Sequence, residues 1–317
     1  MKIIVLDRCT VVNENDIDFS AIDKLGDVEY YDVLPKPKII EKLTDADAVI
    51  CNKAIIDSVV MDKAKKLRYI GLFATGYNNI DIEYAKKKGI TVCNAPNYST
   101  NAVAQLTFSL LLNLAGKTDS YTKFVRDGKW IYSPVFSCFP YSMTEIYGKT
   151  FGIYGLGTIG QAVAKIALAF GMKVKAYSRT KKQVDGVEFV NEEELFRRSD
   201  FLSFHCALTP DTAEKLNKNT LSLMKNTAFV INTSRGGVIN EQDLADALKN
   251  GKIAGAGLDV LVKEPMSEDC PLRNIDNCII TSHIGWAPKE TRERLIDIVA
   301  ENIECFKKGT PINDVTK

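Results

Sequence analysis

Residues 151–160 read FGIYGLGTIG, a short apolar run followed by three spaced glycines, Gly155, Gly157 and Gly160. The residues after this run carry apolar side chains at helical spacing, so the segment predicts a strand, a tight turn and a helix. In this pattern the first glycine permits the turn, the second lets a phosphate approach the backbone, and the third packs the helix against the strand. The helix start presents the free N–H groups of Thr158 and Ile159 to an anion. The segment therefore predicts a dinucleotide-binding turn.

The end of the next expected strand indicates which dinucleotide is bound. An NAD site usually has an acidic residue about 20 positions after the glycines, where it holds the ribose hydroxyls. This chain has Ser178, Arg179 and Thr180 there instead. A carboxylate would repel a 2′-phosphate, whereas hydroxyls and a guanidinium bind it. NADP(H) is therefore favoured and NAD(H) stays open, with a solvated basic turn as the alternative interpretation.

Working outward, short β-branched runs alternate with helical stretches along the whole chain, which is typical of βαβ units. The first series of expected strands is Ile3–Val5, Val28–Tyr31, Ala48–Cys51, Tyr69–Leu72 and Ile90–Cys93. The second series is Phe151–Tyr154, Val174–Tyr177, Phe201–Phe204, Phe229–Asn232, Ala254–Val260 and Cys278–Thr281. We expect an α/β protein with two doubly wound parallel sheets. A Rossmann domain would span 101–287, and a flavodoxin-like substrate domain would combine 1–100 with 288–317.

Composition excludes several other classes of protein. The chain has 317 residues, with 41 Lys and Arg against 40 Asp and Glu, so no global charge gathers nucleic acid or anionic lipid. No run approaches the roughly 18 apolar residues of a membrane span. The eight cysteines form no C-x-x-C pair, which favours reduced thiols in a cytoplasmic protein and no metal site. The sequence predicts neither a nucleic-acid partner nor a membrane partner.

Three further motifs follow strands of the second series, at the sheet edge where ligands bind in open α/β folds. They are NTSRG, which contains Arg235, DVLVKEP, which contains Asp259 and Glu264, and SHIG, which contains His283. A guanidinium, an imidazole and a carboxylate suffice to reduce a 2-keto acid: the cation binds oxygen and the imidazole supplies a proton. The carboxylate favours the charged imidazole. Each residue alone could serve only structure, as a loop cap, a surface carboxylate or a buried histidine.

With these motifs in order behind the glycine turn, the chain resembles the D-isomer-specific 2-hydroxyacid dehydrogenase family over nearly its whole length. The resemblance implies that Arg235 binds substrate, that Glu264 pairs with His283, and that His283 is the acid/base. It also implies that Thr75 and Gly76, in the run ATGYNNID, hold the substrate carboxylate through their N–H groups. The remaining cofactor contacts that it implies are Cys206, Thr233, Ser234 and Asp259.

Within this family, the ATGYNNID run and Ser178–Arg179 most resemble glycerate dehydrogenases, also called hydroxypyruvate or glyoxylate reductases. We therefore expect NAD(P)H-dependent reduction of hydroxypyruvate or glyoxylate to the D-2-hydroxy acid. The alternatives are a D-lactate or phosphoglycerate dehydrogenase of the same family, and a non-enzymatic, corepressor-like protein that senses dinucleotides. Family analogy further implies a homodimer through the dinucleotide domain, with the apolar helix Ala102–Ala115 at the contact.

Overall fold

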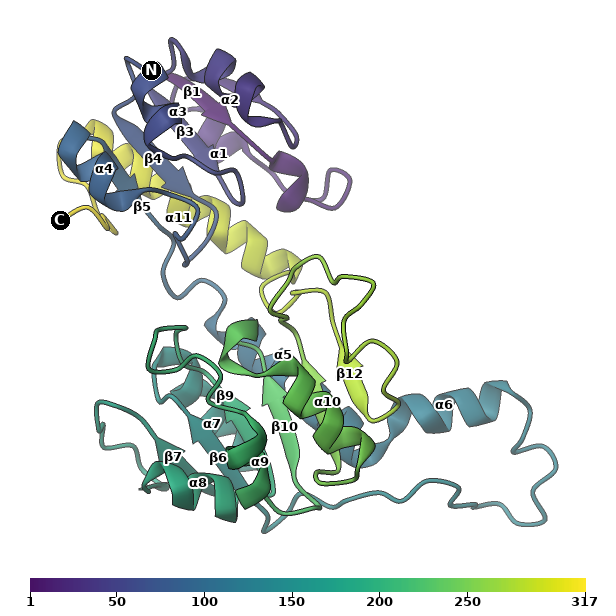
Figure 1. Ribbon diagram of the computed structural model, residues 1–317. Helices are drawn as coiled ribbons and strands as arrows, with labels where there is room; N and C mark the ends of the chain where they lie inside the picture. The colour runs from purple at the N-terminus through teal and green to yellow at the C-terminus, as the bar shows by residue number, and fades with distance from the viewer. The chain divides into compact units, whose positions relative to one another are not determined.

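The computed structural model describes residues 1–317, and the chain divides into two compact units (Figure 1). Unit 1 combines Met1–Ser99 with Trp286–Lys317, and unit 2 is Thr100–Gly285. Both units are built on an all-parallel sheet, so the expected α/β class with two doubly wound sheets is confirmed.

Unit 1 contains a five-stranded sheet in the order β2-β1-β3-β4-β5. Its strands are β1 (Lys2–Val5), β2 (Asp27–Tyr30), β3 (Ala48–Cys51), β4 (Tyr69–Leu72) and β5 (Thr91–Cys93). The central strands β3 and β4 are buried at every position, because a parallel sheet is covered on both faces.

Two helical layers cover the faces of this sheet. One face packs on α1 (Ser20–Asp23) and α11 (Lys289–Lys307), and the other on α2 (Lys36–Leu43), α3 (Ser58–Lys63) and α4 (Ile82–Lys88). A one-turn 3₁₀ helix, η1 (Arg8–Thr10), follows β1. The last helix of the chain therefore returns to the unit in which the chain begins, because its apolar stripe completes that core.

Unit 2 contains a seven-stranded sheet in the order β12-β11-β10-β9-β6-β7-β8. Its strands are β6 (Thr150–Tyr154), β7 (Lys173–Tyr177), β8 (Val187–Phe189), β9 (Phe201–Phe204), β10 (Phe229–Asn232), β11 (Gly255–Leu258) and β12 (Cys278–Ile280). The sequence predicted only six of these strands. It missed β8 because this edge strand has three residues, too few to show an alternating pattern.

The helices of unit 2 are α5 (Thr100–Gly116), α6 (Thr118–Arg126), α7 (Thr158–Ala169), α8 (Glu192–Arg198), α9 (Lys218–Leu223) and α10 (Glu241–Lys249), with a 3₁₀ turn η2 (Gly236–Val238). Helix α5 packs with α7 against one face of the sheet, and its apolar side chains lie in that core. No helix of either unit combines the length and the apolar character needed to cross a bilayer.

Candidate active site

The three motifs of unit 2 follow three neighbouring strands. Arg235 comes after β10, Asp259 and Glu264 after β11, and His283 after β12, and these strands lie side by side in the order β12-β11-β10. Because parallel strands all end at the same edge of a sheet, the motifs share the edge on which the glycine turn after β6 also lies.

Glu264 and His283 form a direct pair at this edge. The Oε2 atom of Glu264 lies 2.7 Å from Nδ1 of His283, and its Oε1 atom accepts the N–H of Leu261 at 2.9 Å. With Nδ1 turned to the carboxylate, Nε2 of the ring is left to face a ligand. About one third of each side chain is exposed, 32% for His283 and 37% for Glu264. The arrangement suits a histidine that exchanges a proton with a bound molecule.

Asp259 holds the turn that carries His283. Its buried carboxylate accepts the hydroxyl of Thr281 at 2.6 Å and the N–H groups of Ile284 and Gly285, each at 2.8 Å. His283 has a φ of 58°, a left-handed conformation that is unfavourable for a non-glycine residue and needs support from its surroundings. The structure thus gives Asp259 a positioning role, and its nicotinamide contact stays a prediction.

Replacing Asp259 with asparagine is expected to destabilise unit 2. The amide NH₂ cannot accept the N–H of Gly285, so the loss of a buried hydrogen bond to a charged group should cost about 1–3 kcal/mol. Urea unfolding followed by circular dichroism measures the change in the free energy of unfolding. Asp276→Asn, at an exposed position before β12, is the matched control. Equal stability of the two variants would contradict the role given to Asp259.

Arg235 projects from a loop organised by Asn232, a residue that sequence reasoning missed. Asn232 is fully buried at the end of β10; its Oδ1 accepts the N–H and hydroxyl of Ser234, and its Nδ2 donates to the carbonyl of Arg235 at 2.9 Å. This is an Asx turn, and the asparagine that opens the NTSRG motif was its only signal. The guanidinium of Arg235 is exposed and has no ion pair; it donates only to the carbonyl of Ser234. Its remaining donors can therefore bind an anionic ligand.

The glycine turn has the geometry that a dinucleotide requires. Gly155 has a φ of 99°, and a Cβ on Gly160 would lie 2.2 Å from the carbonyl oxygen of Gly155, so a larger residue would push α7 off the sheet. A Cβ on Gly157 would instead meet open space. Gly157 is the N-cap residue of α7, and as a glycine it has no side chain to accept the first N–H groups of the helix. The N–H groups of Thr158 and Ile159 are therefore available to a phosphate.

A cavity of about 740 Å³ lies beside this turn, between the ends of β6, β7 and β9. Of the predicted cofactor residues, it is lined by Gly155, Gly157, Ser178, Arg179, Thr180 and Cys206. The shape, the helix start and the cation at the end of β7 fit a dinucleotide with its adenosine in this cavity.

Thr233 and Ser234 lie outside this cavity, in the loop that follows β10. The hydroxyl of Thr233 is buried and lies 3.1 Å from that of Thr107 on α5, so this side chain fixes the loop.

His205, the second histidine of the chain, is unsuited to proton transfer. Its Nε2 lies 2.9 Å from the hydroxyl of Ser203, and its buried Nδ1 has no hydrogen-bond partner. Burial lowers the pKa of His205 to about 3, because removal from water disfavours the charged ring. The ring is therefore neutral at physiological pH, which leaves His283 as the histidine of unit 2 that can serve as an acid.

In unit 1, Thr75 and Gly76 follow β4 in a turn that is hydrogen-bonded to the segment after β5. The hydroxyl of Thr75 donates to the carbonyl of Ala95 at 2.8 Å, and Nδ2 of Asn94 donates to the carbonyl of Thr75 at 2.8 Å. No hydrogen bond donated by the N–H groups of Thr75 or Gly76 is present in the structure. A rigid turn with free N–H groups suits the binding of a carboxylate.

The structure contains no group of three or more His, Cys, Asp or Glu side chains that is arranged to hold a metal ion. All eight cysteines are free thiols.

Comparison with known proteins shows the family of this chain. The sequence pattern of the D-isomer specific 2-hydroxyacid dehydrogenase NAD binding domain matches residues 108–285. A hydroxypyruvate reductase from Blautia hydrogenotrophica is 43% identical over 323 aligned positions, covering 100% of both chains. A glyoxylate reductase from Thermococcus litoralis is 41% identical, covering 96% of this chain and 95% of the relative.

The fold is also similar to that of a solved structure, the TT0316 protein from Thermus thermophilus. The TM-score is 0.90 at 36% identity, covering 99% of this chain and 100% of that one. The chain belongs to the D-isomer specific 2-hydroxyacid dehydrogenase family, whose members are NAD(P)-dependent oxidoreductases that interconvert 2-keto and 2-hydroxy acids.

Proposed function

We propose that this protein reduces glyoxylate or hydroxypyruvate to the D-2-hydroxy acid with NADPH as the preferred cofactor. The observation that carries the proposal is the 2.7 Å contact between Glu264 and His283 on the sheet edge that also bears the unpaired guanidinium of Arg235. The two relatives described above carry the names of these two reductases, which supports this choice of substrate.

His283 is the proton donor in this proposal. A reduced nicotinamide, when bound, supplies the hydride to the 2-carbonyl carbon. The Nε2–H of His283 protonates the carbonyl oxygen as charge develops there, while Glu264 orients the ring through Nδ1. The result is a 2-hydroxy acid and a neutral imidazole that takes up a proton from solvent.

Arg235 and the turn of unit 1 bind the substrate in the same proposal. The planar guanidinium of Arg235 can donate two parallel hydrogen bonds, which matches a carboxylate and the adjoining keto oxygen. The N–H groups of Thr75 and Gly76 hold the carboxylate. A small 2-keto acid fits this scheme, because its carboxylate and its keto oxygen both have named donors.

The cofactor preference rests on the end of β7. Arg179 is exposed beside the cavity, and Ser178 and Thr180 add hydroxyls, whereas no carboxylate follows β7 to bind a ribose diol. A 2′-phosphate would gain charge-assisted hydrogen bonds from these residues.

A spectrophotometric assay of cofactor oxidation tests both parts of the proposal. Glyoxylate, hydroxypyruvate, pyruvate and 3-phosphohydroxypyruvate are each compared with NADPH and with NADH. We expect the highest kcat/KM for glyoxylate or hydroxypyruvate with NADPH. Pyruvate or the phosphorylated acid as best substrate would contradict the substrate class. Tight binding of NADPH without turnover of any acid would indicate a dinucleotide-sensing protein instead.

Replacing Glu264 with alanine is expected to lower kcat for reduction by about 10²-fold, because the 2.7 Å contact that orients the His283 ring through Nδ1 is lost. Steady-state kinetics of cofactor oxidation measure the change. Glu268→Ala, which removes an exposed carboxylate of the same loop, should keep the parent kcat. A Glu264→Ala enzyme with the parent kcat would show that the pair does not position the acid.

We also propose that the protein is a homodimer through unit 2, with α6 and residues 127–147 at the contact. Helix α5, the surface suggested by the sequence, buries nine of its residues inside unit 2. The segment after α6 instead exposes a set of large apolar side chains: Trp130, Ile131, Tyr132, Val135, Phe136, Phe139, Met143 and Tyr147. An apolar patch of this extent is typical of a protein interface.

Size-exclusion chromatography with light scattering tests the dimer. We expect twice the chain mass of 35.2 kDa for the parent and a monomer for the Phe136→Asp/Phe139→Asp variant, since both rings are more than three quarters exposed, 89% and 77%. The control Val59→Asp, at an exposed apolar position of unit 1, should stay dimeric. A monomeric parent protein would refute the proposal.

A further inference from the structure

The turn after β4 carries its two free N–H groups in peptide units whose carbonyl oxygens are both bound by the segment after β5. The N–H of Ala95 donates to the carbonyl of Ala74 at 2.9 Å, and Nδ2 of Asn94 donates to the carbonyl of Thr75 at 2.8 Å. A peptide unit is planar and trans, so its N–H points away from its C=O. The segment after β5 therefore fixes the directions of the N–H groups of Thr75 and Gly76, the donors of the proposed carboxylate site.

Asn302 on α11 binds this segment from the core of unit 1. It is fully buried, and its Nδ2 donates to the carbonyl of Asn94 at 2.9 Å. This carbonyl belongs to the same peptide unit as the N–H of Ala95, which in turn donates to the carbonyl of Ala74. Because a carbonyl only accepts, the amide of Asn302 faces it with nitrogen, and Oδ1 of Asn302 is left to accept from another donor.

That donor lies in the segment after α11. Nδ2 of Asn313 donates to Oδ1 of Asn302 at 2.8 Å, and the carbonyl of Asn313 accepts the N–H of Asn94 at 3.2 Å. The same segment covers the outer edge of β5, where Asp314 forms an antiparallel bridge with Cys93. The segment is therefore fixed in register with β5, and this register places the amide of Asn313 against Asn302.

These contacts form a chain of amide groups that runs toward the substrate turn. In order, its members are the side-chain amides of Asn313 and Asn302, the Asn94–Ala95 peptide unit and the Ala74–Thr75 peptide unit. In each link the nitrogen of one amide donates to the oxygen of the next, so the dipoles all point the same way. Hydrogen bonds in such a chain polarise one another, and they are stronger in a buried site of low dielectric. The N–H of Thr75, at the end of the chain, therefore becomes a better donor to an anion.

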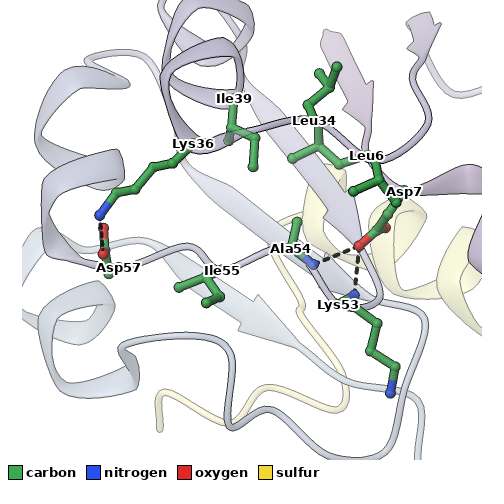
Figure 2. Close-up of a pocket in the computed structure, with 10 residues that line it drawn as sticks. Leu6, Asp7, Leu34, Lys36, Ile39, Lys53, Ala54, Ile55 and Asp57 are labelled. Carbon is green, nitrogen blue, oxygen red and sulfur yellow. Dashed lines mark hydrogen bonds and ion pairs between the residues drawn. The ribbon is translucent and has the colours of Figure 1, made fainter. Parts of the chain in front are cut away.

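The other end of the ATGYNNID run is held separately, by the loop after β3. Nδ2 of Asn79 donates to the carbonyl of Ala54 at 2.8 Å. That loop is fixed by the buried carboxylate of Asp7, which accepts the N–H groups of Lys53 and Ala54, each at 2.6 Å (Figure 2). Because Asn79 is anchored there, the loss of a hydrogen bond at the Thr75 end should turn its peptide units without detaching the whole run.

We propose that Asn302 is a positioning residue for the substrate carboxylate, which acts through the amide chain that ends at the N–H of Thr75. This role rests on the proposed function, because it takes the carboxylate of the 2-keto acid to bind at the Thr75–Gly76 turn. Asn302 lies two hydrogen bonds away from that donor and sets its direction and its strength. The loss of its amide therefore weakens binding of the acid and leaves the transfer of hydride and proton intact.

Steady-state kinetics of the full-length Asn302→Ala variant with glyoxylate and NADPH test this role. We expect KM for glyoxylate to rise about tenfold, the loss typical of one hydrogen bond to a charged group, with kcat within about twofold of the parent. Partial unfolding would lower kcat, because fewer molecules are active, but would not change KM. Binding of NADPH, measured by fluorescence titration, should be unchanged.

A second variant and a control accompany this measurement. Asn313→Gly removes the first amide of the chain and tolerates the left-handed backbone at this position, where φ is 52°; it should raise KM by a smaller factor. Asn313 is partly exposed, so this variant should fold even if Asn302→Ala does not, and an unchanged KM in it would contradict the amide chain. Thr291→Val, which removes another buried polar group of α11, should keep the parent KM.

Titration calorimetry with oxamate, a carboxylate of similar shape that cannot be reduced, measures the same binding without turnover. In the presence of NADPH, the Kd of oxamate should rise about tenfold in Asn302→Ala and stay at the parent value in Thr291→Val. Parent values of both KM and Kd in Asn302→Ala would overturn the role of Asn302 and leave the proposed function in place. A parent protein that binds oxamate but reduces no 2-keto acid would overturn the function instead, and the Kd values would still decide the role of Asn302. A parent that neither binds oxamate nor reduces an acid would overturn both.

Discussion

Replacing His283 with asparagine should lower kcat for 2-keto acid reduction by about 10²–10⁴-fold, the usual contribution of a positioned general acid. Asparagine is the informative substitution, because it tolerates the left-handed backbone that His283 adopts, with a φ of 58°, and so preserves the turn held by Asp259. Binding of NADPH, measured by fluorescence titration, should be unchanged. The loss should therefore appear in kcat and not in the cofactor affinity.

The control for this experiment is Ser282→Ala, the neighbouring exposed position, which should keep kcat within a factor of two or so, as expected of a surface change. A His283→Asn enzyme with kcat near that of the parent would show that the proton comes from another group. Since His205 is buried and neutral at physiological pH, water would then be the remaining candidate, and the proposed mechanism would fail.

Replacing Arg235 with glutamine should lower kcat/KM by about 10²–10³-fold, the typical loss when a donor to a developing oxyanion is removed. The structure supports a large effect, because this guanidinium is paired with no carboxylate and its donors are available to substrate. Arg235→Lys should recover only part of the loss, since an ammonium keeps the charge but cannot donate two parallel hydrogen bonds.

Steady-state kinetics separate the two contributions of Arg235. A rise in KM alone would mean that Arg235 only binds the substrate, whereas a fall in kcat shows that it also stabilises the transition state. The control is Arg273→Gln, an exposed arginine of unit 2 that donates only to the carbonyl of Glu268. If the Arg235→Gln enzyme has the same kcat and KM as the parent, Arg235 does not take part in substrate binding or catalysis.

Some parts of this site could be predicted from local sequence, because their residues lie in contiguous motifs. The glycine spacing predicted the turn after β6, and the 2.7 Å contact shows that Glu264 and His283, 19 positions apart, do meet. This pairing follows from a sheet rule: both residues come just after neighbouring parallel strands, β11 and β12, whose ends share one edge.

Other features had no local signal. Asp259 organises the turn that carries His283, yet it is a single polar residue whose backbone partners, Ile284 and Gly285, lie on another segment. The strand β8 was missed because it is too short to show a pattern. Such roles depend on which N–H groups the folded chain leaves without an acceptor, and composition does not reveal them.

The sequence by itself determined the class of fold, the dinucleotide turn and the family, because periodicity and glycine spacing are properties of consecutive residues. Only the tertiary structure decided that Asp259 supports the turn of His283, and that Asp7 anchors the loop after β3 in unit 1. These are contacts between segments 25 to 47 positions apart, and only the packing of strands against helices sets their distances.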